Sequence, residues 1–108
     1  MNIEMIREYC LEKEGCEEGF PFGEETLVFK VNGKIFCLLS LDEQPLRMNV
    51  KCNPERAIEL RESNSFVLPG YHMNKRHWNT VICEAFVSEK FIKQCIDHSY
   101  ELITLKMK

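Results

Sequence analysis

The chain has 108 residues, of which 44% are hydrophobic and 29% charged, and its formal net charge is −3. This length suits one domain with a single core, and this composition is typical of a folded soluble protein rather than a disordered one. No apolar run approaches the ~20 residues of a membrane-spanning helix, and the acid-rich start of the chain is unlike a secretory signal. We therefore expect one domain over residues 1–108, located in the cytoplasm, with no membrane partner.

The charge is unevenly distributed along the chain. Residues 1–25 hold eight acids and two bases, a balance of −6, whereas residues 26–108 hold nine acids and twelve bases, a balance of +3. The sequence pI of about 5.6 is lower than that of a typical basic nucleic-acid-binding domain. A basic face outside the first 25 residues nevertheless remains open, because electrostatic steering depends on the local potential as well as on the total charge.

Six cysteines occur without a CxxC pair, so the usual zinc-ribbon and redox signatures are absent. Cys37, Cys52 and Cys95 fall where the local pattern requires an apolar side chain. We expect them to be buried free thiols, which a cytosolic chain keeps reduced. Cys16 lies in a polar stretch, and we expect it to be exposed and oxidisable.

The first half of the chain predicts a helix and a hairpin. Residues 3–13 place Ile3, Ile6 and Cys10 at helical spacing beside an acidic stripe, which indicates an amphipathic helix with a solvated side. Residues 14–25 contain three glycines and a proline, so we predict a loop. TLVFKV and KIFCLLSL then flank Asn32-Gly33, the preferred pair for a type I′ turn, and predict a β-hairpin.

A third strand and a second helix follow. Residues 46–52 alternate strictly, which predicts a strand with one packed face and one face toward water. The apolar side comprises Leu46, Met48, Val50 and Cys52, and the polar side Arg47, Asn49 and Lys51. Asn53-Pro54-Glu55 combines an N-cap, a proline at the first helical position and an acid in the first turn, so we predict a helix over residues 54–62.

The last third predicts two strands and a helix. FVLPGYHM and HWNTVICEAF are extended segments around a turn near Asn74 and Lys75, and Ser88 begins a helix with one apolar stripe. The expected order is helix, three strands, helix, two strands, helix. This order, with hairpin connections, indicates a two-layer α+β fold over an antiparallel sheet.

The segment GYHMNKRHWNT, residues 70–80, gathers the polar residues that a binding site would need. Lys75 and Arg76 at a turn could contact the phosphates of a duplex, and the aromatic side chains beside them could stack on bases. The alternative is a polar turn in which Trp78, which alternates with Thr80 and Ile82, belongs to the core. Composition alone leaves both interpretations open.

Metal and enzyme chemistry are not expected. His72 and His77 are five residues apart with no acid nearby, so they do not complete a ligand set. Asp97, His98 and Ser99 are the residue types of a catalytic triad, but they are consecutive in the sequence. Consecutive residues on a helix point about 100° apart, so these three side chains do not form a hydrogen-bonded relay. We therefore expect a protein that is not an enzyme and needs no cofactor.

Four blocks of sequence carry a family resemblance: FPFGEETLVFKV (20–31), VKCNPERAIELRE (50–62), PGYHMNKRHWNTV (69–81) and IDHSYELI (96–103). Together they resemble the MmcQ/YjbR family of small bacterial proteins, nearly from end to end. The resemblance implies an α-β3-α-β2-α architecture similar to secretion-chaperone-like folds. It also implies binding of double-stranded DNA by a "double wing" of hairpins.

Carried onto this chain, the family's first wing corresponds to the turn containing His72, Asn74, Lys75, Arg76 and His77. The candidate second wing is the Asn32-Gly33 hairpin, with Lys30 and Lys34 beside it. Arg47 and Lys51, on the polar side of the third strand, would add basic contacts.

Two functional hypotheses follow. The first is a non-enzymatic DNA-binding or regulatory module that uses the basic hairpin tip. The second is a domain that binds a protein partner or a small ligand in a groove, with Pro21, Phe22 and Gly23 at its rim and Tyr71, His77 and Trp78 at its floor. A third reading makes the polar cluster a structural lock of mutually bonded side chains, namely Asn74, Asn79, His98 and Tyr100. A cleft would favour the groove, and a convex basic hairpin would favour DNA.

Overall fold

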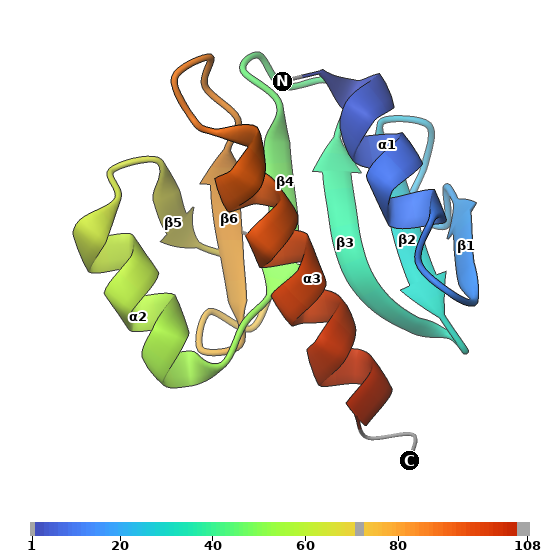
Figure 1. Ribbon diagram of the computed structural model, residues 1–108. Helices are drawn as coiled ribbons and strands as arrows, with labels where there is room; N and C mark the ends of the chain where they lie inside the picture. Colours follow the sequence, from blue (N-terminus) through green and yellow to red (C-terminus); the bar gives the residue numbers. More distant parts are fainter. Residues whose placement is uncertain (1, 71–72, 106–108) are drawn as a thin grey trace.

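A computed structural model describes residues 2–70 and 73–105 and contains three helices and six strands in that part of the chain (Figure 1). The elements are α1 (Ile3–Leu11), β1 (Cys16–Gly19), β2 (Thr26–Val31), β3 (Lys34–Ser40), β4 (Arg47–Lys51), α2 (Pro54–Ser63), β5 (Val67–Pro69), β6 (Trp78–Ile82) and α3 (Glu89–Leu105). The strands form one sheet in the order β1-β2-β3-β4-β6-β5, and every neighbouring pair is antiparallel. The α+β prediction is confirmed.

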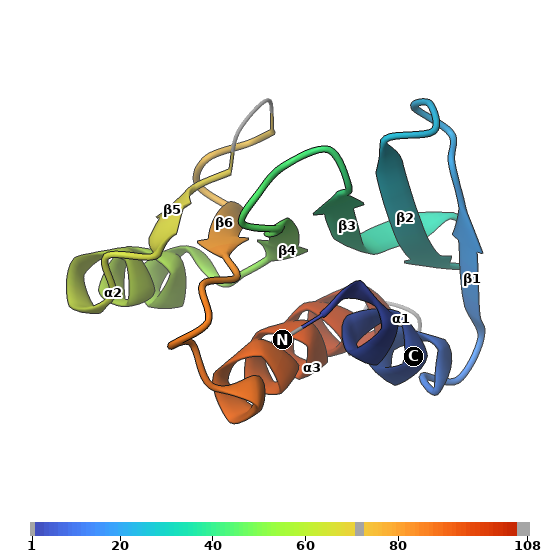
Figure 2. The same ribbon diagram turned by 90° about the horizontal axis from the view of Figure 1, so that it is seen from above.

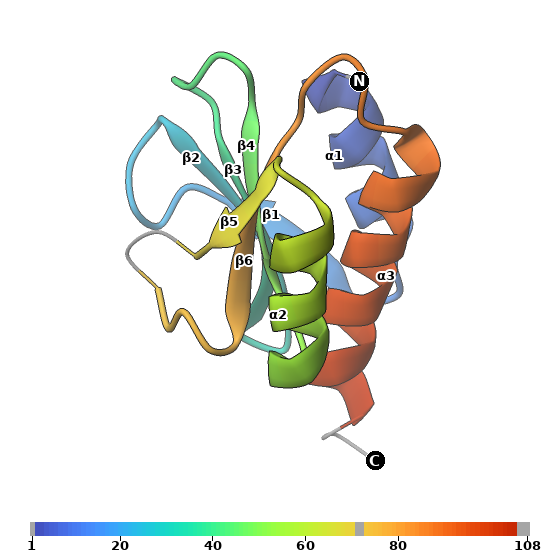
Figure 3. The same cartoon turned by 90° about the vertical axis from the view of Figure 1, so that its left-hand side faces the viewer.

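The sheet and the helices form two layers. Seen from above, α1, α2 and α3 all lie on one side of the sheet, and the loops around residues 20–25, 41–46 and 73–77 lie on the other (Figure 2). The view from the side shows the same separation (Figure 3). We call the face of the sheet opposite the helices the open face.

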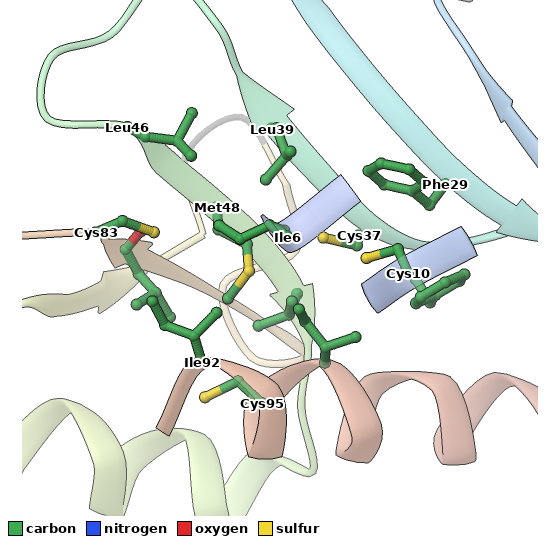
Figure 4. Close-up of a cluster of buried hydrophobic side chains, with 14 of the residues drawn as sticks. Ile6, Cys10, Phe29, Cys37, Leu39, Leu46, Met48, Cys83, Ile92 and Cys95 are labelled. Atoms are coloured by element: carbon green, nitrogen blue, oxygen red, sulfur yellow. The ribbon is translucent and has the colours of Figure 1, made fainter. Parts of the chain in front are cut away.

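The hydrophobic core fills the space between the sheet and the helices. Phe29, Leu39 and Met48 from the strands and Ile6 and Ile92 from the helices are almost completely buried (Figure 4). Cys37, Cys52 and Cys95 are buried free thiols, as predicted. The core uses one face of each strand, and the alternate side chains lie on the open face, where Val28, Leu38 and Thr80 are buried as well.

The predicted turns and caps are present. Asn32 and Gly33 have φ of 50° and 78°, the positive values that a type I′ turn requires, so the hairpin is confirmed. Asn53 Oδ1 accepts hydrogen bonds from the backbone N–H groups of Glu55 and Arg56 at the start of α2. Ser88 Oγ accepts from the N–H of Phe91 in the first turn of α3.

The loop predicted over residues 14–25 is partly wrong, because Cys16–Gly19 form the edge strand β1. The sequence CEEG has little strand propensity, so its pairing with β2 is decided by tertiary contacts. Arg7 of α1 binds Glu18 with both Nε and Nη2, at 2.8 and 2.6 Å, and Glu17 lies opposite Lys30 of β2.

Cys16 is, as expected, the least buried of the six cysteines, but it is not fully exposed. It is half-buried at the start of β1, and burial raises the pKa of its thiol to about 11, with smaller contributions from Cys10, Glu18 and Glu17. A thiol with this pKa is almost fully protonated at neutral pH, and is therefore a poor nucleophile.

The IDHSY segment of α3, residues 96–100, forms hydrogen bonds to several separate parts of the chain. The phenol of Tyr9 and the ammonium of Lys13 both donate to Asp97, at 2.6 and 2.5 Å. His98 Nε2 accepts from the backbone N–H of Asn53 at 3.1 Å, and the hydroxyl of Tyr100 donates to the backbone of residue 14 at 2.7 Å. Asp97, His98 and Tyr100 thus bond to different parts of the chain.

The polar lock expected from Asn74, Asn79, His98 and Tyr100 is not a single cluster. Asn74 Oδ1 caps its own turn, whereas Asn79 Nδ2 donates to the carbonyl of Ala57 in α2. The four side chains stabilise four separate junctions, because each is held by a different segment.

Within the described residues, no helix is long and apolar enough to cross a membrane.

Candidate ligand pocket on the open face

The open face carries side chains in rows across the sheet. Residues paired between antiparallel strands share a face, so the register identifies each row. One row contains Thr26, Ser40, Arg47 and Ile82, and the next contains Val28, Leu38, Asn49, Thr80 and Leu68. The prediction that Arg47, Asn49 and Lys51 share one side of β4 is therefore correct, but the expected exposure of this side to water is wrong for Asn49, which is buried.

A pocket of about 630 Å³ lies over these rows. Its floor comes from β2, β3, β4 and β6, and Phe22, Glu43 and Met73 add walls from three loops. These loops lie on the open side of the sheet (Figures 2 and 3). The described residues that line it are Phe22, Thr26, Leu38, Ser40, Glu43, Arg47, Asn49, Met73 and Thr80. We call this cavity the open-face pocket.

The polar floor of the pocket contains a fixed hydrogen bond. The hydroxyl of Thr80 donates to Asn49 Oδ1 at 2.5 Å, and both side chains are buried, with exposures of 2% and 9%. This bond orients the Asn49 amide, because the carbonyl oxygen faces the hydroxyl and the nitrogen points to the other side of the group. Asn49 is therefore a rigid element of the floor.

Arg47 has an unusual position for a cation. It is half-buried at the start of β4, opposite Ser40, and forms no hydrogen bond or ion pair with any residue in the ranges 2–70 and 73–105. Glu43, the one acid among the described lining residues, is exposed and does not pair with it. The guanidinium is therefore available to an anion that enters the pocket.

The apolar part of the pocket comes from Leu38, Phe22 and Met73. Leu38 is buried in the floor, but Phe22 is 65% exposed although it lines the cavity. Gly23, which follows it, has φ of 113°, a conformation that side chains rarely adopt, so this loop geometry depends on glycine. Contact with a ligand would remove the exposed ring of Phe22 from water.

The groove predicted from sequence and the open-face pocket share Phe22 but have different floors. Phe22 lines the pocket, and Pro21 and Gly23 flank it in the same loop. His77 and Trp78 are not among the described lining residues, and Tyr71 lies outside the residues that the structure describes.

The interpretation of Trp78 as a core residue is wrong. It pairs with Lys51 and shares the open face with Thr80, while the core takes the alternate residue Val81 of β6. The backbone at residue 70 packs closely against Trp78. Glycine permits this approach, because a Cβ at Gly70 would lie 2.7 Å from the Cβ of Trp78.

The residues predicted to contact DNA are spread over the fold. Lys75 and Arg76 are exposed in a turn whose N–H groups are capped by Asn74, and His77 follows them half-buried. Lys34 is exposed beside the Asn32-Gly33 turn. His72 lies outside the described residues.

The remaining bases are not gathered at these turns. Lys30 lies opposite Glu17, so an acid accompanies it on the open face. Arg47 and Lys51 occupy opposite ends of β4, about 13 Å apart at ~3.3 Å per residue, and Arg47 belongs to the pocket. The predicted bases therefore do not form one continuous stripe.

Several lining residues were missed by the sequence interpretation. Thr26, Leu38, Ser40 and Thr80 are ordinary strand residues in a linear reading, and only the strand register shows that they are neighbours. The alternation of Arg47 and Asn49 was the one available signal.

Within the described part of the chain, no three metal-binding side chains gather into a candidate metal site.

Comparison with known proteins gives the family. The YjbR family model matches residues 11–102. The chain belongs to the YjbR family. "Uncharacterized protein YbdF" of Escherichia coli O157:H7 is 35% identical over 100 residues, which cover 93% of this chain and 82% of that protein. "Uncharacterized protein YjbR" of Escherichia coli K12 is 31% identical over 101 residues, which cover 94% and 86%.

Two solved structures show the same fold. The Deinococcus radiodurans protein DR2400, described with a DUF419 domain, matches with a TM-score of 0.92 at 37% identity, over 99% of this chain and 81% of that one. A Pseudomonas syringae protein matches with a TM-score of 0.80 at 27% identity, over 94% and 98%. These relatives support the fold and the family, and their names assign no activity.

Proposed function

We propose that this protein is a non-enzymatic binding module that holds a small ligand in the open-face pocket. One observation carries the proposal: a cavity of about 630 Å³ combines an apolar wall with polar side chains, among them Arg47, which has no hydrogen-bond or ion-pair partner among the described residues. Ligand sites usually have volumes of ~300–1,000 Å³ and combine apolar walls with a few convergent polar groups. The pocket has both properties.

The composition of the pocket favours binding over catalysis. Its described lining contains no cysteine or histidine, and Glu43 is its one carboxylate. Glu43 forms no hydrogen bond with the hydroxyl of Ser40 or Thr26, so no base of the described lining is placed to activate them. A protein of this kind would act by sensing or carrying a ligand rather than by converting it.

The proposal is tested by filling the pocket. Ser40→Trp places an indole over the floor, and Lys30→Trp places the same group on the open face outside the pocket lining. The probes are two fluorescent dyes with the same ring system, the anionic 8-anilino-1-naphthalenesulfonate and the uncharged N-phenyl-1-naphthylamine. The fluorescence of each dye is excited at its own absorption band, so that the added tryptophan does not affect the signal. We expect at least one dye to bind the wild type and the Lys30→Trp variant but not the Ser40→Trp variant.

Circular dichroism must show that both variants remain folded. If a dye binds equally to the two variants, it lies elsewhere on the surface and the proposed site is wrong. Failure of both dyes to bind the folded wild type would also overturn it.

A second candidate function, binding of duplex DNA, is favoured by the positions of two turns. Lys75 and Arg76 are exposed near the start of β6, and the Asn32-Gly33 turn lies at the same end of the sheet. In the sheet order, only β4 separates the β2–β3 hairpin from the β6–β5 pair. Two basic turns so arranged could contact one duplex.

The DNA candidate makes a prediction that charge reversal can test. Lys75→Glu/Arg76→Glu should abolish duplex binding, and the wild-type affinity should fall steeply with added salt because phosphate contacts release counterions. Lys90→Glu/Lys93→Glu changes the net charge equally on α3, on the other side of the sheet, and should have a much smaller effect. Salt-independent binding, or none at low salt, would refute this candidate.

A further inference from the structure

We infer that the ligand of the open-face pocket is a small organic anion, whose charged group is held by Arg47 and Asn49 and whose apolar body lies against Leu38 and Phe22. This inference rests on the proposed function and specifies its ligand class. It follows from the donors that the pocket presents and from the apolar surface beside them.

Arg47 is the first donor. Its side chain is half-buried in the pocket lining and has no ion-pair or hydrogen-bond partner anywhere in the described ranges. A cation that is partly removed from water loses hydration, and an entering anion would compensate for that loss. The planar guanidinium can donate two parallel hydrogen bonds to a carboxylate, sulfonate or phosphate group.

Asn49 is the second donor. The Thr80 hydroxyl already donates to its Oδ1, so the group of Asn49 that still lacks a partner in the described ranges is the Nδ2 amide, which only donates. This nitrogen bonds to no acceptor within the described residues, although Asn49 lines the pocket. The pocket floor therefore offers a ligand a hydrogen-bond donor at Asn49 that is unpaired in the described part of the chain.

The strand register places these donors beside apolar surface. Arg47 and Asn49 are two residues apart on β4, so they share a face about 7 Å apart. Ser40 lies opposite Arg47 and contributes a hydroxyl, and Leu38 lies opposite Asn49. An acidic group at the donors would bring an attached apolar body over Leu38 and under the exposed ring of Phe22.

A cationic ligand fits this arrangement less well. Glu43 is the one anionic side chain of the described lining, and it is exposed on the loop between β3 and β4. Exposed carboxylates interact weakly with cations in water, and Arg47 would repel a cation within the same cavity. The donors of the floor thus determine the sign of the preferred charge.

The same two dyes test the inference, because only the anionic dye carries a sulfonate group. We expect the anionic dye to bind wild-type protein about 10-fold or more tightly than the uncharged dye, the gain typical of one good charge-assisted hydrogen bond. Arg47→Gln should remove most of this preference. Lys30→Gln removes the same charge from the open face outside the pocket and should preserve the preference.

The outcomes separate this inference from the proposed function. If both dyes bind equally, are blocked by Ser40→Trp and are indifferent to Arg47→Gln, the pocket is real and the anion inference is wrong. If Lys30→Gln lowers the preference as much as Arg47→Gln does, general surface charge explains it and the inference is likewise overturned. If Ser40→Trp blocks neither dye, the proposed function itself fails.

Discussion

Replacing Ser99 by alanine should destabilise the protein strongly, although it removes only one oxygen atom. The hydroxyl is completely buried; it accepts from the N–H of Lys51 at 2.9 Å and donates to the carbonyl of Phe36 at 2.5 Å. The β3–β4 pairing ends at Cys37 and Val50, so Ser99 bridges the next residue of each strand. Phe36 is also the extra residue of a β-bulge, since the register shifts between Phe29 and Lys30.

The magnitude follows from the groups that lose this partner. A buried backbone group without a hydrogen bond costs about 1–3 kcal/mol. The Phe36 carbonyl is deeply buried, whereas water can reach the half-buried Lys51 more readily, so we expect a total loss of roughly 2–3 kcal/mol. At ~4 °C per kcal/mol for a domain of this size, Tm should fall by about 8–12 °C.

Urea unfolding followed by circular dichroism measures this loss, provided that the m-value stays unchanged. Thr104→Ala is the matched control, because it removes a hydroxyl from the same helix that only back-bonds to Tyr100 and Glu101. We expect the control to lose at most ~0.5 kcal/mol. Equal losses in the two variants would refute the bridging role of Ser99.

Three further predictions concern pH, packing and thiol reactivity. Burial, followed by the charge of a nearby arginine, lowers the pKa of His98 below 6.5, so the unfolded state takes up a proton more readily. Stability should therefore fall as the pH drops below about 6.5. His98→Gln should weaken this dependence in melting curves measured against pH, and an identical slope would contradict the assignment. Gly70→Ala should cost about 1–3 kcal/mol in urea unfolding because its Cβ meets Trp78, whereas Gly19→Ala meets no atom within 4 Å and should cost less; equal losses would refute the close-approach argument. Cys16, with a pKa of about 11 against an ordinary 9.0, should react with iodoacetamide at neutral pH about 100-fold more slowly than an ordinary thiol, and a normal rate by mass spectrometry would contradict its burial.

The fold was predictable where local chemistry and periodicity agree. Asn32-Gly33 specified the hairpin, Asn53-Pro54 the start of α2, and the alternation of residues 46–52 a strand with two unlike faces. These features depend on neighbours within a few residues, so a linear reading contains them.

The sequence predictions were wrong where contacts between residues far apart in the sequence determine the structure. β1 exists because the edge of β2 accepts CEEG and Arg7 binds Glu18, and neither contact has a local signature. For Trp78, periodicity identified its alternation with Thr80 but not the face to which both residues belong. Position in the sheet order, next to β4 and under the helices, decided that Val81 is the residue buried in the core.

The sequence by itself thus determined the family resemblance, the α+β class and the alternation that sets Arg47 and Asn49 on one side of β4. Tertiary structure decided what that side faces. The helices cover only one side of the sheet, and loops 20–25, 41–46 and 73–77 surround the other side to form a pocket. The physical reason is that strand register joins side chains from four strands into one surface, and register is fixed by burial of the opposite face.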